Sequence, residues 1–250
     1  VKQSMTYGIG MKINNGLLFM SDTRTNAGVD NISTFKKMFS WTNEGHSVVT
    51  ILAAGNLATT QSLISIFQGN GDNEQNLETT ILEQNSMFDV ARSVGRQLRK
   101  VIQSNSDAGQ KADSSFHATL ILGGQIKGDE PTIFMIYPEG NFIEVTSDTP
   151  FFQIGETKYG KPILIRAFDP RMGFAEGLKL MLLSFDSTIE ANLSVAPPLD
   201  FQIYERDSFK LGASGRIEAD DPYYNKISKK WSLALKTAFH SMPNLIIKGN

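Results

Sequence analysis

The chain of 250 residues contains no cysteine, only three histidines and almost no imbalance of charge, with 24 basic against 26 acidic residues. Without cysteine, disulfide bonds, thiolate metal sites and a cysteine nucleophile are all excluded. His46, His117 and His240 lie far apart and lack the close spacing of metal-binding histidines, so we expect no metal site and no cofactor. The net charge of −2 gives no electrostatic reason to expect nucleic acid or an anionic membrane as a partner.

The sequence also lacks a long apolar run and a signal sequence. No run of about 18 apolar residues is present, so we expect no membrane-spanning helix. Val1–Met5 has no apolar core of the kind that signal peptides need, and we expect a cytoplasmic protein. Residues 1–5 precede Thr6 either as a leftover extension or tag remnant, or as a short propeptide. No linker rich in Pro, Gly or Ser divides residues 6–250, which we expect to form a single domain.

Apolar periodicity divides the chain into blocks of strands and blocks of helices. Strands are predicted at residues 6–13, 17–20, 48–54, 116–122, 132–137, 142–145, 151–154, 200–206 and 209–211. Helices are predicted at residues 57–67, 87–102, 161–168, 174–189 and 223–240. Because the blocks segregate, the pattern favours an α+β fold of two stacked antiparallel sheets with helix pairs outside. The arginines of the 87–102 helix lie off its apolar stripe and indicate a solvated face.

The first forty residues bring three chemically useful side chains toward one place. The strand from Thr6 turns at residues 14–16, where asparagine and glycine tolerate positive φ, and a second strand runs to Asp22. An antiparallel hairpin of this length returns Asp22 to the start of the first strand. A third run, from Phe35, places Lys36 or Lys37 near the same end. We therefore expect a threonine, an aspartate and a lysine to meet at one edge of a sheet.

These residue types suit hydrolysis by an N-terminal threonine. A free α-amine has a pKa of roughly 7.7–8.0, so part of it is an unprotonated base near neutral pH. A nearby lysine ammonium favours the neutral amine, and an aspartate holds that lysine in place. Taken alone, the pattern leaves the structural alternative open, in which Thr6 is an ordinary strand residue and Asp22 caps a turn.

Longer motifs extend this pattern. The segments Gly16 to Gly28 (GLLFMSDTRTNAG), Phe35 to Met38 (FKKM) and Ala53 to Asn56 (AAGN) resemble the proteasome β-subunit family of N-terminal nucleophile hydrolases. The resemblance is stronger to its bacterial ancestral β-subunit branch, Anbu. It rests on five segments: MTYG (Met5 to Gly8), DTRTNAGVDNIST (Asp22 to Thr34), IGETKYGKPIL (Ile154 to Leu164), NLSVAPPLD (Asn192 to Asp200) and IYERDS (Ile203 to Ser208).

The resemblance implies a four-layer αββα sandwich with a catalytic threonine at the mature N-terminus. It makes Thr6 the nucleophile and its α-amine the proton acceptor, with Asp22 and Lys37 as partners and the Gly55 N–H as oxyanion donor. Lys37 matches the family pattern better than Lys36, and a strand presents only one of two neighbours to a given site. The implied substrate-binding residues, which line the cleft and flank its pocket, are Thr25, Asn26, Ala53 and Leu57.

The sequence departs from the family at two supporting positions. Gly155-Glu156 stands where proteasome subunits carry a serine that holds the N-terminal amine, and Asn192 stands near a second aspartate, with Ser194 as the neighbouring serine. Glu156 either raises the basicity of the amine or caps the turn at Gly155, and both alternatives stay open. While Val1–Met5 is attached, the nitrogen of Thr6 is an amide, so we expect the chain to be inactive until the extension is removed.

We therefore expect a threonine-type peptidase that acts on a peptide or protein and assembles with copies of itself into a ring or an open helix. Two alternatives remain: hydrolysis of a small amide or an isopeptide on the same fold, and a self-assembling scaffold with little turnover. The sequence does not give the substrate, the oligomer size or an ATPase partner.

Overall fold

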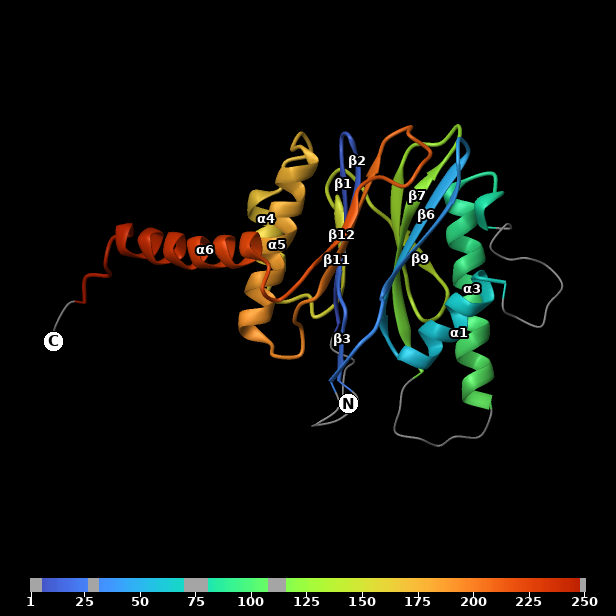
Figure 1. Ribbon diagram of the computed structural model, residues 1–250, viewed down its shortest axis with the longest axis horizontal. Helices are drawn as coiled ribbons and strands as arrows, with labels where there is room; N and C mark the ends of the chain where they lie inside the picture. The colour runs from blue at the N-terminus through green and yellow to red at the C-terminus, as the bar shows by residue number, and fades with distance from the viewer. Residues whose placement is uncertain (1–5, 27–31, 70–80, 108–115, 248–250) are drawn as a thin grey trace.

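Two antiparallel sheets, each of five strands, lie face to face at the centre of the molecule (Figure 1). The computed structural model describes residues 6–26, 32–69, 81–107 and 116–247, so the expected extension at residues 1–5 lies outside the described residues. The first sheet has the strand order β10 (Phe151–Gly155), β1 (Tyr7–Ile13), β2 (Gly16–Asp22), β11 (Leu199–Glu205), β12 (Ser214–Ile217). The second has the order β5 (Met38–Asn43), β6 (Ser47–Gly55), β7 (Ala118–Ile126), β8 (Thr132–Ile136), β9 (Phe142–Glu144).

Helices cover both outer faces of the sheet pair. The second sheet is covered by α1 (Leu57–Phe67) and α3 (Met87–Asp107), and the first by α4 (Lys161–Ala167) and α5 (Phe174–Ala191) (Figure 1). The expected α+β fold, a four-layer αββα sandwich, is thereby confirmed. A further helix, α6 (Pro222–Ser241), extends away from the layers. None of the helices in the described ranges is long and apolar enough to span a membrane.

Alternation along β1 shows how the sequence builds these layers. Tyr7, Ile9 and Met11 point to the helix layer of α4 and α5 and are fully buried there. Gly8 and Gly10 face the other sheet instead. A Cβ atom on Gly10 would lie 2.7 Å from Cγ2 of Ile121, so glycine at this position lets the two sheets approach closely.

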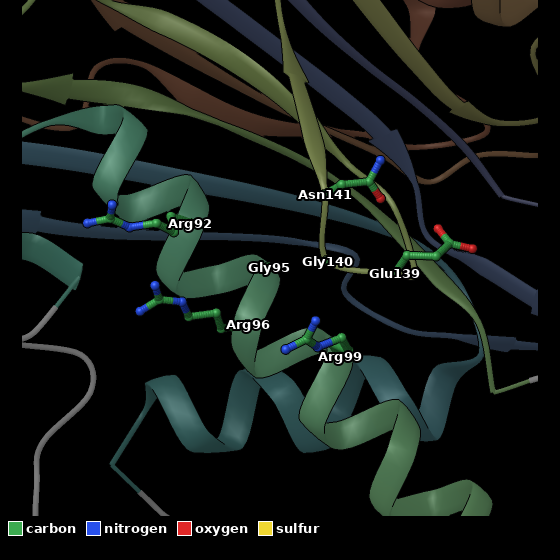
Figure 2. A pocket seen from close by; sticks show the side chains of 7 residues that line it. All are labelled: Arg92, Gly95, Arg96, Arg99, Glu139, Gly140 and Asn141. Atoms are coloured by element: carbon green, nitrogen blue, oxygen red, sulfur yellow. The ribbon is translucent and has the colours of Figure 1, made fainter.

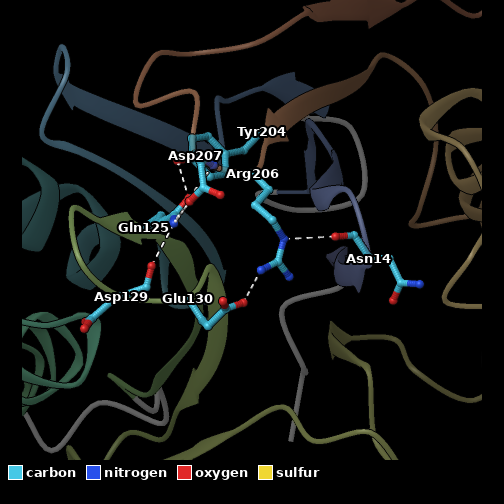
Figure 3. Close-up of polar contacts among 7 residues, drawn as sticks. All are labelled: Asn14, Gln125, Asp129, Glu130, Tyr204, Arg206 and Asp207. Carbon is cyan, nitrogen blue, oxygen red and sulfur yellow. Dashed lines mark hydrogen bonds and ion pairs between the residues drawn. The ribbon is translucent and has the colours of Figure 1, made fainter.

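A polar cluster ties the two sheets together at the end of the sandwich that holds the β1–β2 turn (Figure 3). The hydroxyl of Tyr204 on β11 donates to Oε1 of Gln125 on β7, at 2.7 Å. The amide of Gln125 donates in turn to Oδ1 of Asp207 and to the carbonyl oxygen of Asp129. The guanidinium of Arg206 pairs with Glu130 and donates to the carbonyl oxygen of Asn14. Thr6 precedes β1 at the opposite end of the sandwich, so this cluster does not contact it.

Three details differ from the sequence prediction. The predicted strand at 209–211 is wrong, because Phe209 has φ 47°, which no extended strand adopts. The last strand of the first sheet is instead β12. A short hairpin of β3 (Arg24–Asn26) and β4 (Ile32–Thr34) was not predicted. The run predicted from Phe35 begins as a strand only at Met38, and β5 belongs to the second sheet.

Candidate active site

The β1–β2 hairpin carries Asp22 back to the start of β1. Gly8 pairs with Ser21 across the hairpin, and the backbone N–H of Tyr7 donates to Oδ1 of Asp22 at 2.9 Å. The turn requires glycine at Gly16, since a Cβ atom there would lie 2.0 Å from the carbonyl oxygen of Tyr204. The carboxylate is therefore fixed beside the residue that follows Thr6.

Lys37 reaches the same carboxylate from the other sheet. Its Nζ lies 3.0 Å from Oδ1 and 3.1 Å from Oδ2 of Asp22, and it donates to the carbonyl oxygen of Arg24 at 2.5 Å. Its own carbonyl oxygen accepts the N–H of Ala53 on β6, at 2.9 Å. The meeting point thus lies between the ends of strands from two sheets, and not at the edge of one sheet. Lys36 and Lys37 precede β5, so strand alternation does not separate them; Lys37 is buried and Lys36 is exposed.

Burial controls the electrostatics of this pair. Asp22 is fully buried, and its desolvation raises the pKa of the carboxyl group to about 6, although the ammonium of Lys37 and the Tyr7 N–H oppose that rise. Burial also lowers the pKa of the Lys37 ammonium, against the attraction of Asp22. Two groups with pKa values moved toward neutrality, next to a buried threonine, are typical of a functional site.

A cavity of about 20 Å³ lies beside this pair. That volume holds one or two water molecules. The residues that line it come from the start of β1, from β3, from the segment before β5, and from the junction of β6 and α1: Thr6, Thr25, Lys36, Lys37, Ala53, Gly55, Leu57 and Thr60. Thr60 was not predicted as a site residue. Its place in the first turn of the predicted helix, three residues after Leu57, could have indicated that it lies beside the cavity.

The junction of β6 and α1 presents backbone to the cavity. Gly55 has φ 123°, and a Cβ atom there would lie 2.4 Å from the carbonyl oxygen of His117, so no side chain fits. The next residue, Asn56, caps α1 by accepting the N–H of Thr59 at 3.0 Å. The cavity therefore faces the N-terminus of a helix, whose dipole favours negative charge. Such a position can stabilise an oxyanion.

The two residues that replace family residues, Glu156 and Asn192, lie together with Ser194. The backbone N–H of Glu156 donates to the carbonyl oxygen of Thr6 at 2.8 Å. The Nδ2 of Asn192 donates to Oε2 of Glu156 at 3.1 Å, and the N–H of Ser194 donates to Oδ1 of Asn192 at 3.0 Å. Gly155 makes this approach possible, because at φ 80° its Cβ would lie 1.8 Å from the Thr6 carbonyl oxygen. Glu156 thus contacts Thr6 through its backbone and Asn192 through its side chain.

The residue after Thr6 has a polar anchor that sequence reasoning missed. The hydroxyl of Tyr7 lies 2.7 Å from Oγ of Ser184 on α5 and accepts the amide of Gln153 on β10 at 2.5 Å. Burial raises the pKa of Tyr7 to about 12, so the phenol stays neutral. No local pattern signals these contacts, since the partners are 146 and 177 residues from Tyr7.

Two further predicted residues lie on one short strand, from which Thr25 lines the cavity. Thr25 and Asn26 belong to β3, and Asn26 pairs through its backbone with Ile32, while its side chain lies outside the described part of the chain. In the ranges that the structure describes, no group of three or more His, Asp or Glu side chains is arranged to hold a metal ion.

Comparison with known proteins places this geometry in a family. Residues 4–196 match the proteasome subunit family. An Anbu (Gly-1) mutant from Hyphomicrobium sp. strain MC1 is 46% identical, with TM-score 0.87 over 97% of this chain and 100% of the other. Anbu (ancestral β-subunit) from Yersinia bercovieri is 42% identical, with TM-score 0.86 over the same shares of the two chains. The helical assembly of the Anbu complex from Pseudomonas aeruginosa is 40% identical, with TM-score 0.87 over 96% and 98%. A search of curated proteins gave no match. The chain therefore belongs to the proteasome subunit family and groups with Anbu, the ancestral β-subunit.

Proposed function

We propose that the protein hydrolyses amide bonds with Thr6 as an N-terminal nucleophile, once Thr6 carries a free α-amine. The observation that carries the proposal is the buried Thr6 in a cavity that Lys37 and Gly55 also line, with Asp22 bound to Lys37. Membership of the proteasome subunit family supports a hydrolase of this type.

The chemistry follows from the role of each group. The α-amine of Thr6 takes the proton from its own hydroxyl while Oγ attacks the substrate carbonyl carbon, and the ammonium of Lys37 favours the neutral amine. The Gly55 N–H, at the N-terminus of α1, holds the negative oxygen that forms. The resulting α-ammonium gives its proton to the leaving amine, which leaves an ester on Oγ. Water, deprotonated by the α-amine, then releases the acid and restores Thr6.

Asp22 positions Lys37 in this scheme and does not touch the substrate. Glu156, Asn192 and Ser194 support the Thr6 backbone, through the hydrogen bonds described above. Because Glu156 and Asn192 replace residues typical of proteasome subunits, we propose that they take over the task of holding the N-terminus.

The substrate is a peptide in extended conformation. Asn26 pairs its backbone with the peptide as an added strand, Thr25 lines the cleft, and Ala53 and Leu57 bound the pocket for the side chain before the scissile bond. The cavity of about 20 Å³ favours a small side chain in that pocket.

The experiment that tests the function is turnover of a quenched peptide library by protein that begins at Thr6, with the Thr6→Ala variant alongside. Cleavage that disappears in the variant supports peptidase activity. If the protein cleaves small amides offered in parallel but not the peptides, it is an amidohydrolase of small amides. If Thr6→Ala still cleaves the peptides, Thr6 is not the nucleophile. Asp200→Asn provides a control, since Asp200 pairs with Arg216 on the first sheet and does not line the cavity.

We also propose that the protein assembles with copies of itself through α6. A similar structure from Pseudomonas aeruginosa is a helical assembly, which supports self-association. In this chain Leu235 and Phe239 of α6 are 50% and 75% exposed, and the helix lies apart from the layers (Figure 1). Exposed apolar side chains on a projecting helix are typical of an interface. If the protein assembles but cleaves no peptide in the library experiment, it acts as a scaffold and not as a peptidase.

A further inference from the structure

A second, larger groove lies on the opposite helix layer from α5, between α3 and the turn that joins β8 to β9 (Figure 2). Its volume is about 320 Å³, and it shares no residue with the cavity at Thr6. The arginine groove, as we name it, is lined by Arg92, Gly95, Arg96 and Arg99 of α3 and by Glu139, Gly140 and Asn141 of the turn.

Two glycines shape the arginine groove. A Cβ atom on Gly95 would lie 2.3 Å from the carbonyl oxygen of Gly140, and one on Gly140 would lie 2.6 Å from the carbonyl oxygen of Gly95. The helix and the turn therefore meet backbone to backbone. Arg92 lies about one turn before Gly95 and Arg99 about one turn after it, so their long side chains stand on either side of this low point.

Within the described ranges, acidic side chains balance the positive charge of these arginines only in part. Arg92, Arg96 and Arg99 follow the spacing of one helix face, and Figure 2 shows their guanidinium groups on the same side of α3. Arg92 pairs with Asp89 at 2.6 Å. No ion pair joins Arg96 or Arg99 to an acid within the described ranges. The carboxylate of Glu139 points away from them. Three like charges on one face repel one another, and a bound anion relieves that repulsion.

An exposed aromatic residue continues the same face. Phe88 precedes Arg92 by four residues and is 53% exposed. Its ring makes an edge-to-face contact with Phe142 of β9, with 5.2 Å between ring centroids. An exposed apolar ring thus lies next to a row of guanidinium groups.

We propose that the arginine groove, together with Phe88, binds an acidic segment of a partner protein that carries an apolar residue beside its carboxylates. Guanidinium groups bind carboxylates through paired hydrogen bonds, and arginine clusters are a common means of recognising acidic motifs. The apolar residue of the segment covers Phe88. A net charge of −2 and a sequence pI near 6.0 argue against a long polyanion such as a nucleic acid, whereas a short acidic segment needs only the local positive charge of the groove.

The test is fluorescence anisotropy with a labelled peptide, Glu-Asp-Phe-Glu-Asp-Leu, added to the full chain. The comparison peptide replaces each acid by its amide, and the competing probe is single-stranded oligo-deoxythymidine. Arg96→Glu/Arg99→Glu is the main variant, and Phe88→Ser tests the apolar part. Lys161→Glu/Arg166→Glu on α4 is the matched control, since it makes the same change of charge on exposed residues of the other helix layer.

The expected result is binding of the acidic peptide that weakens at least about tenfold in Arg96→Glu/Arg99→Glu and roughly fivefold in Phe88→Ser. The affinity for the acidic peptide falls as salt increases. The α4 variant binds the acidic peptide as tightly as the unaltered chain does, and the amide peptide does not distinguish the unaltered chain from the groove variant. If charge reversal perturbs folding, Arg96→Gln/Arg99→Gln gives the same comparison with the helix propensity retained.

Three results overturn the proposal. Equal weakening by the α4 variant means that net charge alone drives binding. Tighter binding of oligo-deoxythymidine than of the acidic peptide means that the groove recognises nucleic acid. Loss of self-assembly in Arg96→Glu/Arg99→Glu, with no binding of the peptide by the unaltered chain, means that the groove is a contact between copies.

Discussion

Lys37 and Asp22 form a buried ion pair that joins the two sheets, with Nζ at 3.0 and 3.1 Å from the two carboxylate oxygens. Asp22 ends β2 in the first sheet, and Lys37 directly precedes β5 in the second. The pair therefore reports on the stacking of the sheets as well as on the environment of Thr6. The proposed chemistry and the stability of this end of the sandwich are linked through the same two side chains.

Removing either partner separates these two roles. Breaking a buried pair from one side leaves a polar group without its partner and costs roughly 3 kcal/mol in the free energy of unfolding. We expect such losses in Asp22→Asn and in Lys37→Met, with reactivity of Thr6 reduced about 100-fold or more. The double variant regains stability, because no buried charge remains, but it does not regain reactivity. Urea unfolding and the rate of labelling by an electrophile measure the two effects, and recovery of both would contradict the assignment.

The pKa of Asp22 predicts how reactivity depends on pH. Burial raises that pKa from 3.8 to about 6, so protonation below pH 6 removes the negative charge that holds Lys37. Protonation of the α-amine, whose ordinary pKa is roughly 7.7–8.0, already slows labelling of protein beginning at Thr6 as the pH falls toward 6, and we expect the rate to fall more steeply below pH 6 than above it. A rate that keeps the same slope above and below pH 6 would show that the charge of Asp22 is not required.

The raised pKa of Asp22 also makes the free energy of unfolding depend on pH. Because the folded-state pKa is higher than the unfolded value, the folded chain binds this proton more tightly between about pH 4 and 6. The contribution of Asp22 to the free energy of unfolding therefore rises as the pH falls through that window, and it is lost as the pH rises above 6. Asp22→Asn removes this contribution. Urea unfolding at several pH values gives the difference between the two proteins, which should change as the pH passes through this window.

Gly155 provides a test of the backbone that supports Thr6. At φ 80° a Cβ atom would lie 1.8 Å from the Thr6 carbonyl oxygen, so Gly155→Ala forces β10 away from β1. We expect a loss of about 3 kcal/mol or more, together with loss of labelling at Thr6. Gly128→Ala is the matched control: its φ is 101° but nothing lies within 4 Å, so it carries only backbone strain of roughly 1–2 kcal/mol. Equal effects of the two substitutions would mean that the close approach does not matter.

The projecting helix α6 predicts the behaviour of assembly variants. Replacing its exposed apolar residues in Leu235→Glu/Phe239→Glu should lower the mass of the assembly in analytical ultracentrifugation and leave the thermal unfolding of the sandwich nearly unchanged. Lys236→Glu, at an exposed position of the same helix, controls for added negative charge and should leave the mass unaltered. An unchanged mass in the double variant would place self-association elsewhere on the molecule.

The sequence predicted which residues of the candidate site meet, because most of them lie in local motifs. The β1–β2 hairpin follows from alternation and from the turn at Gly16, and it alone carries Asp22 to the start of β1. What local patterns do not contain is the pairing of distant segments. They did not reveal that Lys37 enters from the second sheet, that Tyr7 contacts Ser184, or that Gly95 and Gly140 meet. Each of these depends on how the layers stack, which no run of neighbouring residues determines.

The short hairpin of β3 and β4 shows the same limit at smaller scale. Its strands are only three residues long, too short for alternation to separate a strand from a loop. The failed strand at 209–211 arises for a different reason. The positive φ values of Asp207 and Phe209 belong to a segment bound to Gln125 of the other sheet, so tertiary contacts override the local apolar run.

The most direct measurement of the central claim is the intact mass of protein that begins at Thr6 after treatment with an electrophile directed at N-terminal threonine. The account predicts one adduct per chain, located at Thr6, that is absent in Thr6→Ala and absent when residues 1–5 remain attached. Failure of the protein beginning at Thr6 to form an adduct, or equal labelling of the Thr6→Ala variant, would contradict it.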